Sequence, residues 1–411
     1  MAAFPRIPVA KLIAAGEAEL KTGPFGTQLK ASEYTEEGTP VINVRNIGMG
    51  SIKTDKLEFI SNVTRDRLSS HLLRRGDIVF GRKGAVERHV FIRKGQDGWF
   101  QGSDCLRLRF NSPRVEPLFA SYFFVTEEHQ RWMMNQCSHG ATMSSLNQEI
   151  LERIELPLPS IAVQRRIAGI LSAYDELIEN SQRRIRILEE IARALYREWF
   201  VQFRFPGHGE ARLIESPLCP VPQGWSVKKL SEVAEVNRAQ INARNKPDEL
   251  HYIDISSVSP GQIESITTYA FTDAPGRARR IVQHGDVLWS CVRPNRRSHA
   301  LIMQPQANTI ASTGFAVLTA KMVPFTFLYV ATTTDDFVGY LTNNASGAAY
   351  PAVTAETFEK AKLLVPPPAL LKRFGDATIP MAEQAHILRR QITNLRWTRD
   401  LLLPRLLSGN L

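Results

Sequence analysis

The residues in this sequence best suited to contact another molecule are cations on two short loops. Residues 81–84 (GRKG) follow the apolar run 78–80 and carry Arg82 and Lys83 between two glycines. Residues 291–297 (CVRPNRR) hold the corresponding place in the second half of the chain and carry Arg293, Asn295, Arg296 and Arg297. Arg and Asn side chains form paired hydrogen bonds with guanine and adenine in the major groove of DNA.

Either loop, taken alone, is explained equally well as a solvated loop whose cations pair with nearby acids. Two different cationic loops at equivalent places of a repeated sequence favour contact with DNA. A protein that reads two DNA sequences is expected to vary its contact loops and to keep its framework.

Further polar residues are candidate DNA contacts. Arg277, Arg279 and Arg280 form a cluster suited to phosphates. Thr142 and Tyr350 lie in two polar loops, 139–147 and 346–354, in which the serines 144 and 145 are better explained as caps of the following helical turn. For Arg238, and for the loop 23–27 near the equivalent place of the first half, contact and plain exposure are equally supported. The remaining predicted contacts are Arg45 and Asn46.

Motifs for catalysis are absent from the sequence. It contains no GxxxxGK[ST] phosphate loop, no glycine-rich dinucleotide fingerprint and no Asn-Pro-Pro-aromatic motif of an amino-methyltransferase. Its histidines show no HxH or HxxxH pairing, and its four cysteines are scattered without a CxxC pair. We therefore predict no catalytic residue, no metal site and no cofactor bound by this chain.

Composition places the chain among soluble, intracellular proteins. It has 411 residues, enough for two or three domains, with 43% hydrophobic and 22% charged residues. No apolar run is long enough to span a bilayer, the N-terminus lacks a signal-peptide core, and scattered cysteines are typical of a reducing compartment. We expect a cytoplasmic location. The net charge of +10 is spread along the chain and supports a polyanionic partner only weakly.

The loops must be positioned by two long helices. Residues 160–200 contain a heptad seam that starts at Gln164, and residues 371–406 repeat it, starting at Leu371, with every position 207 residues later. A helix of this length, about 60 Å, needs an equally long partner, and the two should pair antiparallel. The predicted seam residues are Ile167, Leu171, Tyr174, Ile178, Ile185, Leu188, Leu195, Phe374, Met381, Leu388, Ile392, Leu395 and Leu402.

The globular segments repeat as well. Residues 252–263 match 41–52, residues 284–288 match 75–79, and residues 346–367 match 139–160. We predict an α+β protein with two tandem mixed α/β domains, two long helices in an antiparallel coiled coil, and an internal pseudo-twofold repeat. The expected domains are 1–159, 160–202 (first helix), 203–221 (linker), 222–368 and 369–411 (second helix).

Local patterns predict details within this framework. Residues 41–47 and 105–110 alternate like strands, and residues 117–136 read as one amphipathic helix. Pro404 should end or kink the second helix, and Gly375 and Pro380 should make part of its start irregular.

This layout resembles the specificity subunit of type I restriction–modification systems over essentially the whole chain. The resemblance is carried by GPFGTQLK, EGTPVINVRNI, RRGDIVFGRKG, LNQEILERIELPLPSIAVQRRIAGILSAYDELIE and LYREWFVQF in the first half, and by VPQGWSVKKLSEVAE, HGDVL, LLVPPPALLKRF and LLLPRLLSGNL in the second. It implies two target-recognition domains, each binding one half of a split site in double-stranded DNA, and a coiled coil that acts as a ruler.

The resemblance also implies partners. The family member assembles with two modification subunits, which methylate adenine with S-adenosylmethionine, and with two restriction subunits, which translocate and cleave DNA with ATP and Mg²⁺. The charged residues Arg183, Arg186 and Glu190 on the first helix are a hypothetical docking face for the methyltransferase. Two alternatives stay open: a specificity factor of another methylation-based defence complex, and a coiled-coil scaffold that does not bind DNA.

Overall fold

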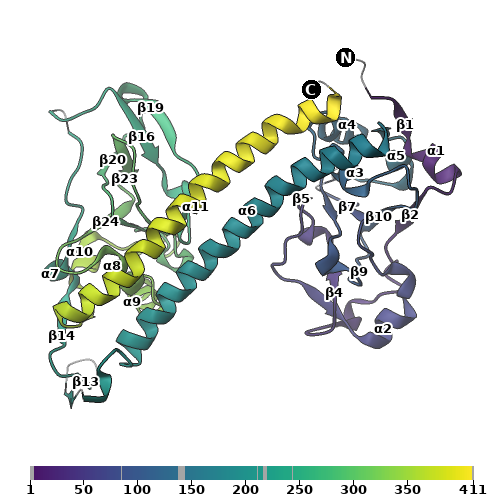
Figure 1. The fold of residues 1–411 in the computed structure, drawn as a ribbon. Coiled ribbons are helices and arrows are strands. Elements are labelled where there is room, and N and C mark those ends of the chain that lie inside the picture. Colours follow the sequence, from purple (N-terminus) through teal and green to yellow (C-terminus); the bar gives the residue numbers. More distant parts are fainter. Residues whose placement is uncertain are drawn as a thin grey trace. The chain divides into compact units, whose positions relative to one another are not determined.

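The structure is a computed structural model that describes residues 4–84, 86–137, 144–210, 212–215, 220–242 and 244–409. The chain divides into two compact units, Met1–Glu179 with Ile392–Leu411 and Asn180–Gln391. Two long helices, α6 (Ile161–Tyr196) and α11 (Pro368–Ser408), each contribute one part to each unit (Figure 1). None of the helices among the described residues combines the length and the hydropathy that crossing a membrane requires.

The first unit is built on two sheets and a short strand pair. One sheet has the order β2 (Ala18–Thr22), β10 (Cys105–Phe110), β7 (Ile78–Gly81), β8 (His89–Phe91) and β5 (Met49–Gly50). The other has the order β3 (Tyr34–Thr35), β6 (Glu58–Ile60), β4 (Thr39–Ile42) and β9 (Phe100–Gln101), and β1 (Arg6–Pro8) pairs with β11 (Glu155–Pro157). Its short helices are α1 (Val9–Ala14), α2 (Asn62–Arg67), α3 (Pro117–Phe124), α4 (Glu127–Cys137) and α5 (Gln148–Glu152).

The second unit repeats this plan. Its first sheet has the order β15 (Ala234–Val236), β24 (Phe315–Ala320), β21 (Val287–Ser290) and β22 (His299–Leu301). Its second has the order β19 (Thr267–Ala270), β16 (Glu249–Ile253), β23 (Thr309–Ser312) and β20 (Ala278–Ile281). The paired strands are β14 (Ser226–Lys229) with β25 (Lys362–Val365), β17 (Val258–Ser259) with β18 (Gln262–Ile263), and β12 (Leu213–Ile214) with β13 (Val221–Pro222). Its helices are α7 (Leu230–Val233), α8 (Phe325–Thr332), α9 (Asp335–Asn343) and α10 (Ala355–Lys360).

Strand register confirms the internal repeat. β7 pairs antiparallel with β10 and β8, and β21 pairs in the same way with β24 and β22. Each second sheet contains one parallel pair, β4 with β9 and β16 with β23. The central strands β7 and β21 are buried along their whole length because both faces of their sheet are covered, which is why their sequences are runs of apolar residues.

Each unit contains its own stretch of antiparallel helix pairing. In the first unit, Leu171 of α6 shares a hydrophobic core with Leu406 of α11, and Asp175 lies 2.7 Å from Arg399. In the second unit, α6 continues as a π-helical turn, Arg197–Val201, and Trp199 of this turn packs against Phe374 of α11 with ring centroids 6.2 Å apart. Higher numbers in one helix therefore meet lower numbers in the other. All thirteen predicted seam residues are buried or half-buried.

Pro404 was expected to end or kink the second helix. It does not end it, because α11 runs through Pro404 to Ser408. An interior proline costs about 3 kcal/mol. Leu406 and Leu407, which follow it, are buried in the core of the first unit, and burying each contributes about 1.5–3 kcal/mol. Packing beyond the proline thus offsets its local cost. The start of α11 is likewise regular through Gly375 and Pro380.

Two local predictions also need correction. Residues 117–136 form two helices rather than one, because the Thr126 hydroxyl donates to the Phe123 carbonyl at 2.7 Å and accepts the His129 N–H at 3.3 Å, which caps a new helix. The expected strand 41–47 ends at Ile42 and continues as a 3-10 turn over Val44–Asn46. The strand at 105–110 is confirmed as β10.

Candidate nucleic-acid interface

The two loops predicted separately in the second half of the chain lie side by side. The Arg293 N–H donates to the Pro351 carbonyl at 2.7 Å, and the Val353 N–H donates to the Cys291 carbonyl at 2.9 Å. Between them, Val292 and Ala352 form an isolated antiparallel bridge. The basic loop after β21 and the polar loop before α10 therefore form one surface element, here called the second paired loop (residues 291–297 and 346–353).

The first unit contains the same element. The Gly84 N–H donates to the Ser144 carbonyl at 3.1 Å, the Leu146 N–H donates to the Arg82 carbonyl at 2.8 Å, and Lys83 forms a bridge with Ser145. Residues 81–84 and 144–146 are here called the first paired loop. Thr142, a predicted contact, lies outside the described residues.

Side chains differ strongly between the two paired loops. In the second, the guanidinium carbon of Arg293 lies 4.5 Å from the centroid of the Tyr350 ring, and Tyr350 is 68% exposed. Asn295 and Arg296 are also exposed at the tip of a 3-10 turn. Arg297 instead forms an ion pair with Asp335 at the start of α9. The second paired loop thus presents a stacked cation, an amide and a further cation to solvent.

The first paired loop presents less positive charge to solvent than the second. Lys83 is exposed but lies 3.5 Å from the carboxylate of Asp104. Arg82 is half-buried, and its Nε has no hydrogen-bond partner among the described residues. A buried donor of this kind normally finds a partner, so Arg82 is the polar group here with hydrogen-bonding capacity left over.

One member of the predicted arginine cluster around β20 lies over an aromatic ring, together with a lysine. Arg279 and Lys246 both lie over the Phe271 ring, at 5.6 Å and 5.7 Å from its centroid. Arg277 is exposed, and Arg280 is half-buried with its Nε unpaired among the described residues. Each of the two cations is attracted by the electron-rich face of the ring that it lies over, and cations gathered in this way are suited to a phosphate. Lys246 was not among the predicted contacts, because it lies 33 residues from Arg279 along the chain.

Three other predicted contacts have partners within the protein. Asn46 is fully buried, and its side-chain amide donates to the Lys53 carbonyl at 3.0 Å, so we withdraw it as a DNA contact. Arg45 forms an ion pair with Glu58 at 2.6 Å. Arg238 hydrogen-bonds to the Gln283 side chain. Arg45 and Arg238 are exposed cations with a competing partner, which places them behind Arg293 and Arg296 as candidates.

Burial also argues against nucleophilic chemistry at this surface. Burial raises the pKa of the Cys291 thiol to about 11, so the thiol stays protonated at neutral pH. No group of three or more His, Cys, Asp or Glu residues with the spacing of a metal site occurs in the part of the chain that the structure describes.

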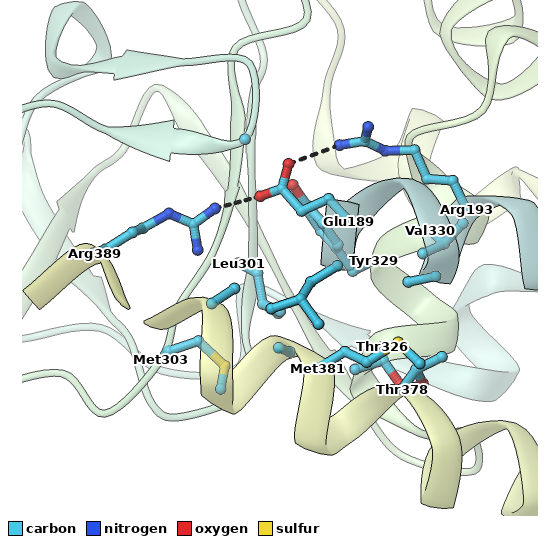
Figure 2. A pocket seen from close by; sticks show the side chains of 15 residues that line it. Glu189, Arg193, Leu301, Met303, Thr326, Tyr329, Val330, Thr378, Met381 and Arg389 are labelled. Atoms are coloured by element: carbon cyan, nitrogen blue, oxygen red, sulfur yellow. Dashed lines mark hydrogen bonds and ion pairs between the residues drawn. The ribbon is translucent and has the colours of Figure 1, made fainter. Parts of the chain in front are cut away.

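A small cavity in the second unit lies where α6 and α11 pack against α8 and β22. Figure 2 shows the Glu189 carboxylate between the guanidinium groups of Arg389 and Arg193, with Met303 and Met381 among the apolar side chains below. The cavity volume is about 60 Å³. Ligand pockets usually measure about 300–1,000 Å³, so this one is too small for a nucleotide or for S-adenosylmethionine. It is a packing defect in the helix seam with an ion-paired rim.

Comparison with known proteins decides the family. The family model described as type I restriction modification DNA specificity domain matches residues 23–190 and again residues 222–370. The chain belongs to this family. The first match covers most of the first unit and extends along α6 beyond Glu179, and the second match lies within the second unit, so the family's domain occurs twice in this chain.

Individual relatives in the family agree. The MjaIX specificity subunit of Methanocaldococcus jannaschii is 25% identical over 299 residues, which are 71% of this chain and 68% of the relative. The HindI specificity subunit of Haemophilus influenzae is 21% identical over an alignment of 413 residues, covering 82% of this chain and 87% of the relative. The crystal structure of a type I system S subunit from M. genitalium matches with a TM-score of 0.63 at 16% identity, over 98% of this chain and 96% of that one. This last likeness supports the fold.

Proposed function

We propose that this chain is the DNA-binding specificity subunit of a type I restriction–modification complex, and that each unit binds one half of a bipartite, asymmetric site in double-stranded DNA. The observation that carries the proposal is the occurrence of the same paired loop in both units with different exposed side chains. A repeated scaffold with diverged contact residues suits two half-sites of different sequence.

Affinity and specificity come from different groups in this proposal. The cations around Phe271 bind phosphates and hold the second unit in register, while the exposed side chains of the paired loops contact base edges. In the first unit, the candidates for contact with base edges are Lys83 and Arg82 of the first paired loop. Because phosphate contacts release counterions, binding should weaken steeply as salt rises.

The chain contributes recognition, and its partners contribute chemistry. Two modification subunits that use S-adenosylmethionine methylate adenines in the bound site, and restriction subunits that use ATP and Mg²⁺ translocate and cleave. Arg183, Arg186 and Glu190 are all exposed on α6, which fits the proposed docking face for a methyltransferase. Charge reversal of these three residues should release the methyltransferase while DNA binding by the chain persists; an intact complex would remove this assignment.

The test is a domain exchange read out by methylation. The chain is expressed with its modification subunit, and long-read sequencing that detects methyladenine defines the modified motif. Replacing residues 1–159 with the same region of another family member should change one half of the motif and leave the other half and the spacer unchanged. A change in both halves would refute the assignment of one half-site to each unit.

Binding to a split-site duplex and identification of co-purified proteins, together with the methylation motif, separate the alternatives. A scaffold that does not bind DNA predicts no split motif and no salt-sensitive binding to a split-site duplex. A specificity factor of a different methylation-based complex predicts the motif but a different motor or nuclease among the co-purified partners.

A further inference from the structure

Two residues of the second paired loop, Arg293 and Arg297, have a backbone conformation that arginine rarely adopts, and Arg297 uses its side chain in an ion pair with Asp335. Arg293 has φ +51° and ψ +62°, the left-handed region that favours glycine. The residue at the equivalent position of the first paired loop is Gly84, with φ +78°. The equivalence is set by hydrogen bonds, since the N–H groups of Gly84 and Arg293 donate to the carbonyls of Ser144 and Pro351. The second unit therefore keeps a glycine conformation and places an arginine in it.

At the position shared by Gly84 and Arg293, a side chain leaves the backbone toward open space. A Cβ placed on Gly84 would meet no atom within 4 Å. A side chain there contributes nothing to a core, so packing does not explain why the second unit has an arginine. Backbone conformations that are locally unfavourable are concentrated at ligand-binding positions.

The Arg293 side chain is held in one plane. Its guanidinium stacks over the Tyr350 ring at 4.5 Å, and one terminal nitrogen donates to the Ala349 carbonyl at 3.2 Å. Among the ion pairs of the described residues, none involves Arg293, whereas Arg297 next to it is paired with Asp335. A guanidinium has five N–H donors, so several remain for a ligand.

Two features distinguish a base contact from a phosphate contact. A phosphate requires a positive charge and tolerates a flexible side chain, as a lysine shows. A guanine edge requires two parallel N–H groups in a fixed plane, aimed at N7 and O6. The plane of the Arg293 guanidinium is fixed by stacking on an exposed aromatic ring and by a hydrogen bond to a carbonyl. Fixing it costs side-chain conformational entropy, and a phosphate contact does not require that cost.

We infer that Arg293 reads a guanine in the half-site bound by the second unit, and that Tyr350 positions its guanidinium. This inference rests on the proposed function, because it requires that the unit bind DNA. It also predicts that the first unit, with Gly84 at this position, lacks the equivalent contact.

The equivalence of the two loops supplies the test variant. Arg293→Gly installs the residue of the first paired loop and suits the left-handed backbone, so the variant should fold at least as stably as the parent. The full-length parent chain and the variant are each used to select duplexes from a randomised pool. The parent should select a two-part motif with a guanine in one half, and Arg293→Gly should lose the preference for that base by roughly 5- to 150-fold while the other half is unchanged.

Three further measurements make the test specific. Arg293→Lys keeps the charge and should also lose the guanine preference, whereas Arg373→Lys, at an exposed arginine of α11 outside both paired loops, is the control and should keep it. Tyr350→Phe should behave like the parent, and Tyr350→Ala should weaken the preference. Replacing the guanine by 7-deazaguanine removes the N7 acceptor, and should weaken binding by the parent but not by Arg293→Gly.

The outcomes separate the inference from the proposed function. If the parent selects a split motif and Arg293→Gly keeps the same guanine, the inference is overturned and the proposed function stands. If Arg293→Gly weakens binding equally on all sequences and lowers the salt dependence, Arg293 contacts a phosphate, and the inference is again overturned. If the parent selects no motif, both fail.

Discussion

The side-chain amide of Gln164, the first residue of the helix seam, should be essential to the stability of the first unit, whereas its counterpart in the repeat needs no polar group. Its side chain is fully buried and satisfies three backbone groups: it accepts the Glu116 N–H at 2.9 Å and donates to the carbonyls of Arg114 and Pro159, both at 2.8 Å. At the equivalent position of α11 stands Leu371, buried among apolar residues. The informative substitution is therefore Gln164→Leu, the residue that the protein itself uses 207 positions later.

The expected cost follows from these contacts. Each backbone group left without a partner costs about 1–3 kcal/mol, and taking about 1.7 kcal/mol for each of the three gives about 5 kcal/mol. Burying a leucine in place of the amide returns about 2 kcal/mol. The net loss should be about 3 kcal/mol, confined to the first unit.

Hydrogen exchange followed by mass spectrometry is the suitable assay, because it reports each unit separately in a chain that need not unfold in one step. Gln164→Leu should speed exchange of protected amides in residues 115–124 and 161–171 by about 100-fold, since each 1.4 kcal/mol is a factor of ten. Residues 368–378 of α11 serve as the internal reference and should exchange as in the parent. The reciprocal Leu371→Gln should show the reverse pattern, because it buries an amide in an apolar site.

A Gln164→Leu variant whose first unit exchanges within threefold of the parent would refute the reasoning. It would mean that water or a backbone shift satisfies the three groups.

Two further predictions concern buried ionisable groups. Burial lowers the pKa of both His89 and His129 to about 3, so the folded state excludes protons that the unfolded state binds below about pH 6.5. The free energy of unfolding should therefore fall as pH falls, by roughly 2 kcal/mol per histidine between pH 6.5 and pH 5. The fall measured by urea unfolding should be smaller in His129→Phe by the share of that one histidine, since His71 and His299, whose pKa values are lowered to about 4, contribute to the rest; an unchanged pH dependence would contradict this. Asp77 is buried and accepts two hydrogen bonds from Arg109, both at 2.7 Å, whereas its counterpart Asp286 accepts one from Thr319 at 2.7 Å. Arg109→Ala should cost about 3–5 kcal/mol because it leaves a buried carboxylate without its cation, and Thr319→Val only about 1 kcal/mol; equal losses in urea unfolding would show that the ion pair has no special role.

The repeated plan could be read from the sequence because it depends on periodicity. The seams that begin at Gln164 and Leu371 keep one phase over many turns, and a helix of that kind has to be covered along its length. The strands at 78–80 and 105–110 were likewise predictable from short apolar or alternating runs. The absence of catalytic motifs is a statement about residue types and needs no coordinates.

Local patterns failed where contacts that form only in the folded chain decide the outcome. Pro404 is compatible with a continuous helix because the leucines beyond it are buried against another part of the first unit. Asn46 looked like a base-reading residue, but the chain folds over it and uses its amide to hold a turn. The partner that decides the outcome is distant in the sequence for Pro404, whereas for Asn46 it is a turn of nearby residues, Asn43 and Lys53, whose closure the residue types alone do not reveal.

The candidate interface shows the same division. The sequence named the basic loops and the polar loops as separate candidates, and it determined that they differ between the repeats. Only the tertiary structure decided that each basic loop pairs with a polar loop about 60 residues away, that Arg293 stacks on Tyr350, and that Gly84 and Arg293 share one backbone conformation. The reason is physical: residue type and period are properties of the chain, whereas the hydrogen bonds that join two loops exist only after the sheets between them have formed.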